Sequence, residues 1–333
     1  MAEATIRDVA RRAQVSVASV SRVLNRLDNV SDETRARVTA AVDALGYVPH
    51  AGARSLSLAK TGAIGVVLPN LHGEFFSEIV RGMDRLATER GYLLLLSNMH
   101  AQSGEAETVL KAMRGRVDGL IVMAPHLEDV EFATAIPRGT PAVLVNTRAE
   151  ISDRPAIHLD NAAGARAVAE HFVATGRRRI VHVSGPLGNI DAEERAAAFK
   201  RALARHEDVQ SIVIQGDFYE ASGGAAVAAL TESGQTFDAI FAGNDMMAIG
   251  ALEALRDRGL KVPEDVAVAG FDDVPLANHL RLTTVRVRIA ELGERAIERL
   301  ILMLEGKEDS IGEELHAPEL VVRGSTVAGM PVR

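Results

Sequence analysis

From residue 63 onward the chain alternates short apolar runs with segments whose apolar residues recur at helical spacing. Ala63–Leu68 reads as a buried strand, and the positions from Phe76 to Ala87 mark one face of a helix. Further predicted strands are Tyr92–Leu96, Gly119–Met123, Ala142–Val145, Ala156–Leu159, Ile180–Ser184, Ser211–Gln215, Ala239–Ala242 and Val266–Gly270. This alternation predicts parallel sheets covered on both faces by helices, such as Ala192–His206 and Asp245–Arg258. About ten strands favour two doubly wound α/β subdomains over one sheet.

The first 48 residues have a different, purely helical pattern. Thr5 and Asp8 have the spacing of a capping box, which predicts a helix that begins after Thr5. The stretch QVSVASVSRVLN, residues 14–25, alternates like a strand, but the adjacent Val23 and Leu24 fit only helical spacing. Ser16 is a suitable N-cap for this second helix, with Val17, Val20, Val23 and Leu24 expected on its buried face.

A third helix is expected between Ser31, as its N-cap, and Gly46, which ends it. Two short helices joined by a tight turn and followed by a third predict a helix-turn-helix module, whose second helix enters the DNA major groove. The small side chains of Ser16, Ser19 and Ser21 allow close approach to DNA, and Arg22 can pair with a guanine. A small helical bundle with no DNA role is the alternative interpretation.

The distribution of charge agrees with a DNA-binding module at the N-terminus. Residues 1–60 carry nine Lys/Arg and six Asp/Glu, a net charge of +3, whereas the whole chain of 333 residues has a net charge of −8. There is no cysteine, so disulfides, thiol catalysis and Cys-ligated metals are excluded. We find no apolar signal segment and no stretch that could span a membrane, so we expect a cytoplasmic protein.

Polar and aromatic residues follow many of the predicted strands, where ligands bind in sheets of this kind. They are Asn70, Asn146, Asp160, Asn161, Asn244, Asp245, Asp272 and Asp273, with Phe75, Phe76 and Phe218 in comparable loops. Carboxylates, amides and aromatic rings together suit a polyhydroxylated ligand. Each Asp or Asn taken alone is equally well explained as a turn or N-cap residue. The nucleotide-binding, hydrolase and metalloprotease motifs that we sought are missing, so we expect no catalytic residues, no cofactor and no metal.

Together these residues resemble the LacI/GalR family of transcriptional regulators along essentially the whole chain. The most specific segments are residues 5–10, 15–25, 46–49 and 53–56, and the body adds Arg195 and the segments 243–248, 270–273, 282–285 and 321–326. The resemblance implies a body like a periplasmic sugar-binding protein, and a repressor of carbohydrate-utilisation genes that is nucleoid-associated when bound to its operator. It also implies a homodimer on near-palindromic double-stranded operator DNA, with a sugar or sugar-derived effector in the cleft between the subdomains.

The resemblance also implies domain boundaries and site residues. Residues 1–48 would form the DNA-binding domain, 49–61 a hinge helix, and 62–333 the effector-binding and dimerisation domain. Its N-subdomain would comprise about 62–160 and 290–319, and its C-subdomain about 161–289 and 320–328. The implied DNA-binding residues are Thr5, Ser16, Val17, Ala18, Ser19, Ser21, Arg22, Asn25, Asn29, Tyr47, Ala53 and Leu56. The implied effector-binding residues are Phe75, Phe76, Asn146, Asp160, Asn189, Asp191, Arg195, Phe218, Asn244 and Asp272.

Some positions depart from the family pattern. Val287 stands where relatives often have a ligand-facing glutamine, and Asn189 replaces the arginine of the purine-responsive branch. The tetramerising heptad helix of the family is absent from this sequence, so we expect a dimer. The alternatives that stay open are an effector that acts as corepressor, an effector that is not a sugar, and a solute-binding protein. A sugar-metabolising enzyme is opposed by the missing catalytic motifs.

Overall fold

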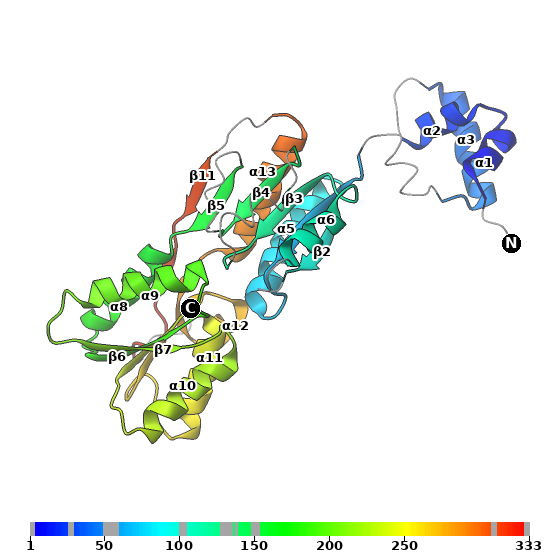
Figure 1. The fold of residues 1–333 in the computed structure, drawn as a ribbon. Coiled ribbons are helices and arrows are strands. Elements are labelled where there is room, and N and C mark those ends of the chain that lie inside the picture. The colour runs from blue at the N-terminus through cyan, green and yellow to red at the C-terminus, as the bar shows by residue number, and fades with distance from the viewer. Residues whose placement is uncertain are drawn as a thin grey trace. The chain divides into compact units, whose positions relative to one another are not determined.

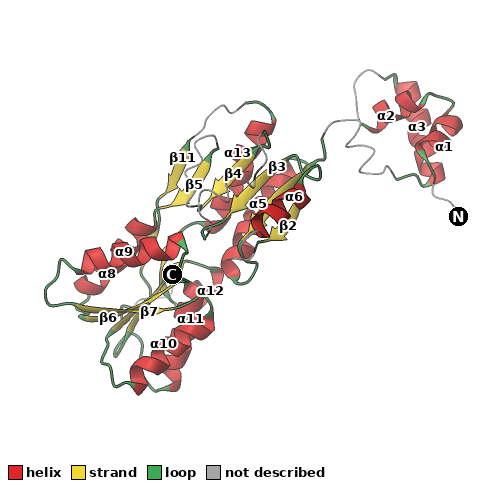
Figure 2. Cartoon of the chain, viewed as in Figure 1, coloured by secondary structure: helices red, strands yellow, loops and turns green. Residues whose placement is uncertain are grey.

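The computed structural model describes residues 4–25, 30–48, 60–99, 105–126, 136, 139–147, 154–307 and 312–329. The chain divides into two compact units, one of residues 1–62 with 115–117 and one of the remaining residues. In their described parts the first unit contains helices and the second contains two sheets with covering helices (Figure 2). The expected fold class, an all-α N-terminal domain followed by a doubly wound α/β body, is confirmed.

The N-terminal unit contains the three helices that its capping residues predict. They are α1 (Ile6–Ala13), α2 (Val17–Leu24) and α3 (Asp32–Leu45). Thr5 and Asp8 form the reciprocal capping box, in which Thr5 N donates to the Asp8 carboxylate at 3.0 Å. Ser16 Oγ accepts a hydrogen bond from Ser19 N at 3.1 Å, which starts α2. Ser31 caps α3, and Gly46 ends it in the left-handed conformation at φ 59°.

The core of this unit is small and is made of valine and alanine. Val9, Val20 and Val38 are fully buried, one from each helix. Val17 is 41% exposed, so the expectation that it packs on the buried face of α2 is wrong. At the first position of α2 its side chain lies on the outer surface, because the inward positions of so short a helix are Val20 and Val23.

The first sheet of the body is parallel throughout, with strand order β11-β5-β4-β3-β1-β2. Its strands are β1 (Ala63–Leu68), β2 (Leu93–Asn98), β3 (Gly119–Met123), β4 (Ala142–Val145), β5 (Ala156–Leu159) and β11 (Glu313–His316). The helices that accompany it are α5 (Glu74–Glu89), α6 (Glu105–Met113) and α13 (Ile289–Leu304). Strands β1, β3 and β4 are almost wholly buried, as near-continuous apolar runs should be.

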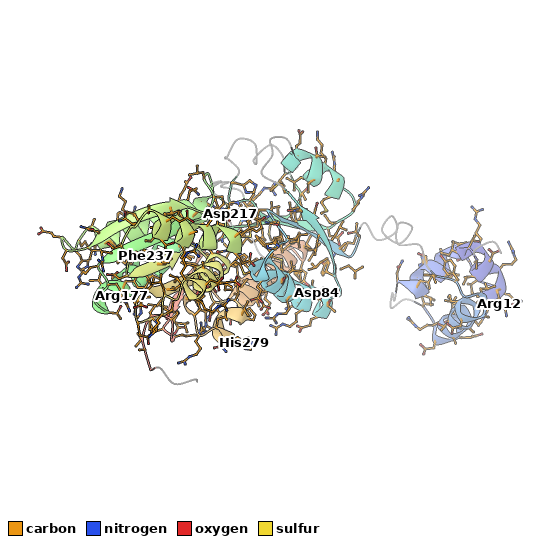
Figure 3. The ribbon with its side chains drawn as sticks, turned by 90° about the horizontal axis from the view of Figure 1, so that it is seen from below. Arg12, Asp84, Arg177, Asp217, Phe237 and His279 are labelled. Atoms are coloured by element: carbon orange, nitrogen blue, oxygen red, sulfur yellow. The ribbon has the colours of Figure 1, made fainter. Side chains whose placement is uncertain are left out.

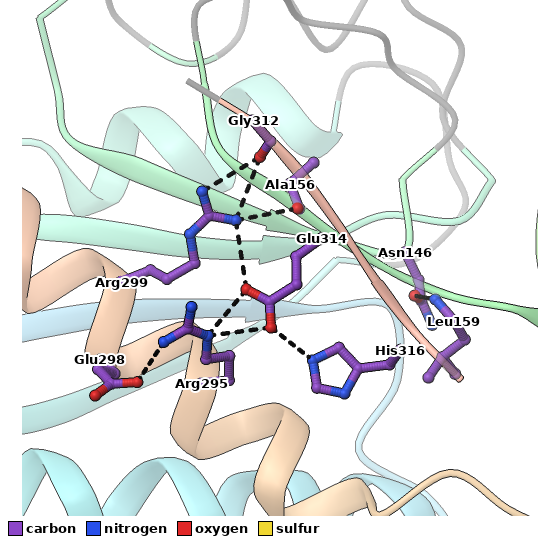
Figure 4. Close-up of polar contacts among 9 residues, drawn as sticks. All are labelled: Asn146, Ala156, Leu159, Arg295, Glu298, Arg299, Gly312, Glu314 and His316. Carbon is purple, nitrogen blue, oxygen red and sulfur yellow. Dashed lines mark hydrogen bonds and ion pairs between the residues drawn. The ribbon is translucent and has the colours of Figure 1, made fainter. Parts of the chain in front are cut away.

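Strand β11 joins this sheet from the far end of the chain, and ion pairs hold it there (Figure 4). Arg299, which is buried on α13, donates to the carbonyl oxygens of Ala156 and Gly312, each at 3.3 Å. Arg295 donates to the Glu314 carboxylate at 2.9 Å. The sequence did not predict β11, because four residues, of which Glu313 and Leu315 are exposed, have too short a pattern to recognise.

The second sheet has the same architecture, with strand order β12-β10-β9-β8-β6-β7. Its strands are β6 (Arg179–Ser184), β7 (Gln210–Gln215), β8 (Ala239–Ala242), β9 (Ala267–Asp272), β10 (Thr283–Arg286) and β12 (Glu319–Val321), of which only β12 runs antiparallel to its neighbour. Its helices are α8 (Asn161–Ala174), α9 (Ile190–Leu203), α10 (Glu220–Glu232), α11 (Asp245–Asp257) and α12 (Pro275–His279). Figure 1 shows α8 and α9 on one face of the sheet and α10 and α11 on the other.

Close helix packing in the body depends on glycine at a few positions. A Cβ on Gly82 of α5 would lie 2.0 Å from the carbonyl oxygen of Ala290, at the start of α13. A Cβ on Gly250 of α11 would lie 1.9 Å from the carbonyl oxygen of Glu220, at the start of α10. No side chain fits at either position without moving backbone. Across the described part of the chain, no helix combines the length and apolar character needed to cross a membrane.

Candidate functional site

The exposed face of α2 presents a short row of small side chains and one arginine. Ser16, Val17, Ala18 and Arg22 are all exposed, and Val17 and Ala18 are the first two residues of the helix. The N-terminal end of a helix-turn-helix recognition helix is the part that faces base edges. The structure therefore leaves the predicted base-reading residues Val17, Ala18 and Arg22 accessible.

Other predicted DNA-binding residues have structural partners. Thr5 is engaged in the capping box, and the Tyr47 side chain is only 9% exposed because it packs in the core of the helical unit. Asn25 Nδ2 donates to Ser21 Oγ at 3.3 Å at the end of α2. Ser19 is half-buried, and its backbone N donates to Ser16 Oγ at 3.1 Å. Three predictions, Asn29, Ala53 and Leu56, lie outside the described residues, as does most of the expected hinge segment 49–61.

The body contains a cavity of about 340 Å³. The residues that line it come from loops at the strand ends of both sheets. Its described lining residues are Pro69, Asn70, His72, Gly73, Phe75, Phe76, Met123, Pro125, His126, Asn146, Pro186, Asn189, Asp191, Arg195, Asp217, Phe218, Tyr219, Asn244, Met246 and Asp272. The volume lies within the usual range of small-molecule sites, about 300–1,000 Å³. Asp217, labelled in Figure 3, is on the loop after β7.

Nine of the ten residues predicted to bind the effector line this cavity. The exception is Asp160, which does not line the cavity; its Oδ1 accepts a hydrogen bond from Ala163 N at 2.8 Å and caps α8. The sequence alone left open whether each Asp or Asn after a strand binds a ligand or caps a helix. Asp160 caps a helix. Val287 is buried and does not line the cavity either.

The sequence reading missed several lining residues, among them His72, His126, Asp217, Tyr219 and Met246. Asp217 and Tyr219 flank the predicted Phe218, so their proximity to it was an available signal. His126 lies three residues beyond the end of β3, in a loop that contains none of the Asp or Asn residues used to find the site. Its position after a predicted strand was visible in the sequence, but its burial and the lack of a described partner for Nε2 were not.

Arg195 is the central charged group of the second-sheet wall. Its guanidinium donates to Asn161 Oδ1 at 2.8 Å and to the Gly243 carbonyl oxygen at 2.6 Å. It also lies 4.0 Å from the Asp272 carboxylate and 3.7 Å from the centre of the Phe271 ring. Because the side chain is buried, these contacts take the place of water around the positive charge.

The carboxylates around Arg195 are strongly desolvated. Burial raises the pKa of Asp272 to about 7, although Arg195 opposes this shift. Burial also raises the pKa of Asp191, which accepts a hydrogen bond from Asn161 Nδ2 at 2.8 Å. Behind the wall, burial and the nearby Asp272 raise the pKa of Asp245 well above its ordinary value. Such shifted carboxyl groups lining or backing one cavity are typical of functional sites.

Backbone conformation gives independent evidence for a functional site. Asn146, Phe218 and Asp272 all line the cavity, and all have positive φ angles, of 44°, 71° and 117°. For a bulky residue such as Phe218 this is a strained conformation. The Asn244 side chain donates to the Phe218 carbonyl oxygen at 3.0 Å, and Gly185 leaves space for its ring. Strain of this kind concentrates at binding sites.

Residues of the two walls also contact one another directly at the cavity. Asn70 Nδ2 donates to Tyr219 Oη at 2.6 Å, and the His72 and Tyr219 rings lie 5.0 Å apart. Ile190 N donates to the Pro125 carbonyl oxygen at 2.9 Å. These contacts join the loops after β1 and β3 to the second-sheet half of the body.

Comparison with known proteins gives matches along the whole chain. Residues 5–50 match the model of bacterial regulatory proteins of the lacI family, and residues 169–326 match a periplasmic binding protein-like domain. The chain is 36% identical over 329 residues to the ribose operon repressor of Halalkalibacterium halodurans, covering 98% of each protein. The chain belongs to the LacI family. Another LacI-family relative is the regulator AscG of Escherichia coli, 34% identical over 97% of this chain and 98% of that protein.

Solved structures of LacI-family proteins have the same fold as this LacI-family chain. The lac repressor dimer bound to operator and the anti-inducer ONPF matches with a TM-score of 0.88 and 31% identity, over 98% of this chain and all of that one. The regulator CelR in complex with cellobiose matches with a TM-score of 0.71 and 29% identity, over 97% of this chain and 99% of that one.

Proposed function

We propose that this chain is a sequence-specific DNA-binding regulator whose affinity for its operator is controlled by a small molecule in the cavity. The observation that carries the proposal is the presence, in one chain, of an exposed helix-turn-helix surface and a lined cavity in a periplasmic-binding-protein-like body. Lac repressor, whose dimer is bound to operator, resembles the chain over 98% of its length. Repression of carbohydrate-utilisation genes is the outcome that the names of the relatives support.

The chemistry of the cavity supports a sugar or a sugar derivative as the effector. Asp191, Asp272 and Asn244 offer hydrogen-bonding oxygens and an amide, and Phe75, Phe76 and Phe218 offer apolar rings. One similar protein is named as a ribose operon repressor, and another was solved in complex with cellobiose. Their similarity to this chain supports the proposal. For the described residues that line the cavity we propose no catalytic role, no cofactor and no metal.

For DNA recognition we propose that Val17, Ala18 and Arg22 contact base edges, with Ser16, Ser19, Ser21, Asn25 and Asn29 near phosphates. Leu56 of the hinge would be inserted at the central base step. The domain boundaries at residues 48 and 61 and the subdomain boundaries given above are part of this proposal. A cytoplasmic location follows from the same proposal.

We further propose that the chain binds DNA as a homodimer. The edge strand β2 carries exposed leucines, of which Leu93 is 75% exposed, and among the described residues no strand pairs with its outer edge. Exposed apolar edge strands are normally covered in the functional assembly. A second copy of the chain would cover this strand, and it would also supply the second recognition helix that a near-palindromic operator needs.

The test is selection of bound sequences from random double-stranded DNA by the full chain, followed by affinity measurement on the selected site. A near-palindromic site is expected. Arg22→Ala should weaken binding roughly 5- to 150-fold, because a bidentate arginine–guanine pair contributes about 1–3 kcal/mol. Arg201→Ala, at an exposed position of the body, is the matched control and should leave the affinity unchanged. Failure to select any sequence would contradict the proposed function.

The direction of the ligand effect separates induction from corepression. A ligand that weakens operator binding is an inducer, and one that strengthens it is a corepressor. In either case the coupling is expected to be about 1–3 kcal/mol, a 5- to 150-fold change in operator affinity. A chain that binds sugar but no DNA would instead be a solute-binding protein.

A further inference from the structure

Two buried polar atoms on the first-sheet wall of the cavity have no hydrogen-bond partner among the described residues. They are Nε2 of His126, on the loop after β3, and Nδ2 of Asn146, directly after β4. Both residues line the cavity. Because buried polar groups are almost always paired, such atoms in a cavity wall indicate positions where a ligand makes hydrogen bonds.

The Asn146 side chain has a defined orientation. Its Oδ1 accepts a hydrogen bond from Leu159 N at 3.1 Å (Figure 4), and its backbone N donates to the Ile157 carbonyl oxygen at 2.9 Å. The residue is 2% exposed. The contact with Leu159 assigns oxygen and nitrogen within the amide, because only the oxygen can accept. The amide nitrogen is therefore a donor that a ligand acceptor can satisfy.

His126 offers the complementary function. Burial lowers the pKa of His126, so that its ring is neutral at physiological pH. A neutral imidazole accepts a hydrogen bond at one nitrogen and donates at the other. A hydroxyl group can serve either tautomer at Nε2, because it both donates and accepts.

An unpartnered histidine nitrogen does not by itself indicate a ligand. Nε2 of His182 also has no partner among the described residues, but that ring is stacked on Phe241 at 4.7 Å in the core and does not line the cavity. His126 differs because it lines the cavity together with a second unpartnered group. The pair, and not either atom alone, is the evidence.

The charges of the cavity restrict the ligand further. Arg195 is the only lysine or arginine among the described lining residues, and its guanidinium already contacts Asn161, Gly243 and Asp272. Three carboxyl groups line the same cavity, those of Asp191, Asp217 and Asp272. An added phosphate or carboxylate would meet these acids and find no uncommitted guanidinium or ammonium group.

We propose that the cavity selects an uncharged polyhydroxylated ligand, a free sugar or a glycoside, and that His126 and Asn146 form the hydrogen-bonding pair that selects it from the first-sheet wall. Sugar phosphates and sugar acids are excluded because the described lining residues offer them no uncommitted cation. This inference rests on the proposed function, since it specifies the effector class of the site.

The ligand class is tested by titration calorimetry on the full chain. The neutral probes are D-ribose, D-galactose and cellobiose, and the charged probes are ribose 5-phosphate, galactose 6-phosphate and D-galacturonate. At least one neutral probe should bind, with its charged counterparts at least a hundredfold weaker. A charged probe that binds as tightly as its neutral counterpart overturns the inference, and so does a lack of binding by every neutral probe.

The residue pair is tested with the neutral probe that binds most tightly. His126→Phe removes the ring nitrogens, and Asn146→Asp keeps the acceptor for Leu159 N but removes the donor. Each should weaken binding tenfold or more, whereas His126→Gln should recover much of the affinity because glutamine can accept and donate. His206→Gln, at a half-buried histidine outside the cavity, is the matched control and should bind like the parent.

Thermal unfolding of each variant identifies loss of fold, so that loss of affinity in a folded variant is attributable to the site. Unchanged affinity in folded His126→Phe and in folded Asn146→Asp would overturn the role of the pair. Selection of operator DNA by the parent chain is measured separately. Loss of that activity would contradict the proposed function, whereas sugar binding would still decide the ligand class.

Discussion

The two walls of the cavity are organised in opposite ways. On the second-sheet wall, Arg195 is hydrogen-bonded to Asn161 and Gly243 and lies near two carboxylates. On the first-sheet wall, His126 and Asn146 each present a polar atom without a described partner. The second wall is held by contacts within the protein, whereas we propose that the first wall makes its hydrogen bonds with the ligand. Four predictions test this difference.

The largest effect on stability is expected from removing Arg195, the cation of the second-sheet wall. Arg195→Met should lower the free energy of unfolding by about 3–5 kcal/mol, because the buried carboxyl groups of Asp191 and Asp272 lose their counter-charge. Urea unfolding measures this loss. His126→Phe, in the other wall, should change stability far less. Equal losses in the two variants would contradict the contrast between the walls.

The aromatic part of the second wall depends on one glycine. In Gly185→Ala the new Cβ would lie 2.2 Å from the Phe218 ring, so the ring must move. We expect about 1–3 kcal/mol of destabilisation and at least tenfold weaker binding of the best neutral sugar by calorimetry.

Gly224→Ala on α10 is the control for this variant. The nearest atom to its new Cβ is at an ordinary 3.5 Å, so the variant should be as stable as the parent or up to about 1 kcal/mol more stable. Full sugar affinity in Gly185→Ala would show that the position of the Phe218 ring does not matter for binding.

The buried carboxyl of Asp272 predicts a pH effect on stability. Because its folded pKa is raised to about 7 from 3.8, the folded state keeps a proton that the unfolded state loses between these values. Stability from this group therefore falls as pH rises through that window. Between about pH 4 and pH 7, Asp272→Asn should gain stability relative to the parent as the pH rises, measured by urea unfolding. Asp217→Asn, at an exposed carboxyl of the same cavity, is the control, and the same pH response in both variants would refute the assignment.

The smallest effect is expected at the start of α9. Asn189 Oδ1 accepts a hydrogen bond from Ala192 N at 3.1 Å, so Asn189→Ala should cost about 1 kcal/mol through loss of the N-cap. Asn189→Ser keeps a capping oxygen and should restore the stability in thermal unfolding. If serine restores stability but sugar affinity stays low, Asn189 also contacts the ligand through its amide.

Much of the fold was predictable because its signals are local. The caps at Thr5, Ser16 and Ser31 lie next to the helices they start, and buried strands such as β3 and β4 are continuous apolar runs with the predicted bounds. The missed strands β10, β11 and β12 are three or four residues long and obtain their partners from distant segments. Their pairing is a property of the tertiary structure, so no local pattern reveals it.

The candidate site shows the same division between local and non-local signals. Asn146, Asn244 and Asp272 could be predicted because they lie at or just after the ends of apolar strands. Asp160 follows a strand as well, yet its carboxylate is turned to its own helix, which periodicity cannot show. His126 could not be chosen, since its role depends on burial and on the lack of a described partner for Nε2. Val17 was misplaced because apolar character alone does not separate a core residue from one exposed on the surface.

The central claim is that one chain couples sugar in the cavity to affinity for DNA. Its most direct test is fluorescence anisotropy of the selected operator with the full chain, titrated with and without a saturating amount of the tightest-binding neutral sugar. We predict a 5- to 150-fold change in operator affinity with the sugar, and a much smaller change in His126→Phe at the same sugar concentration. Sequence-specific DNA binding that does not respond to a sugar bound in the cavity would contradict the account.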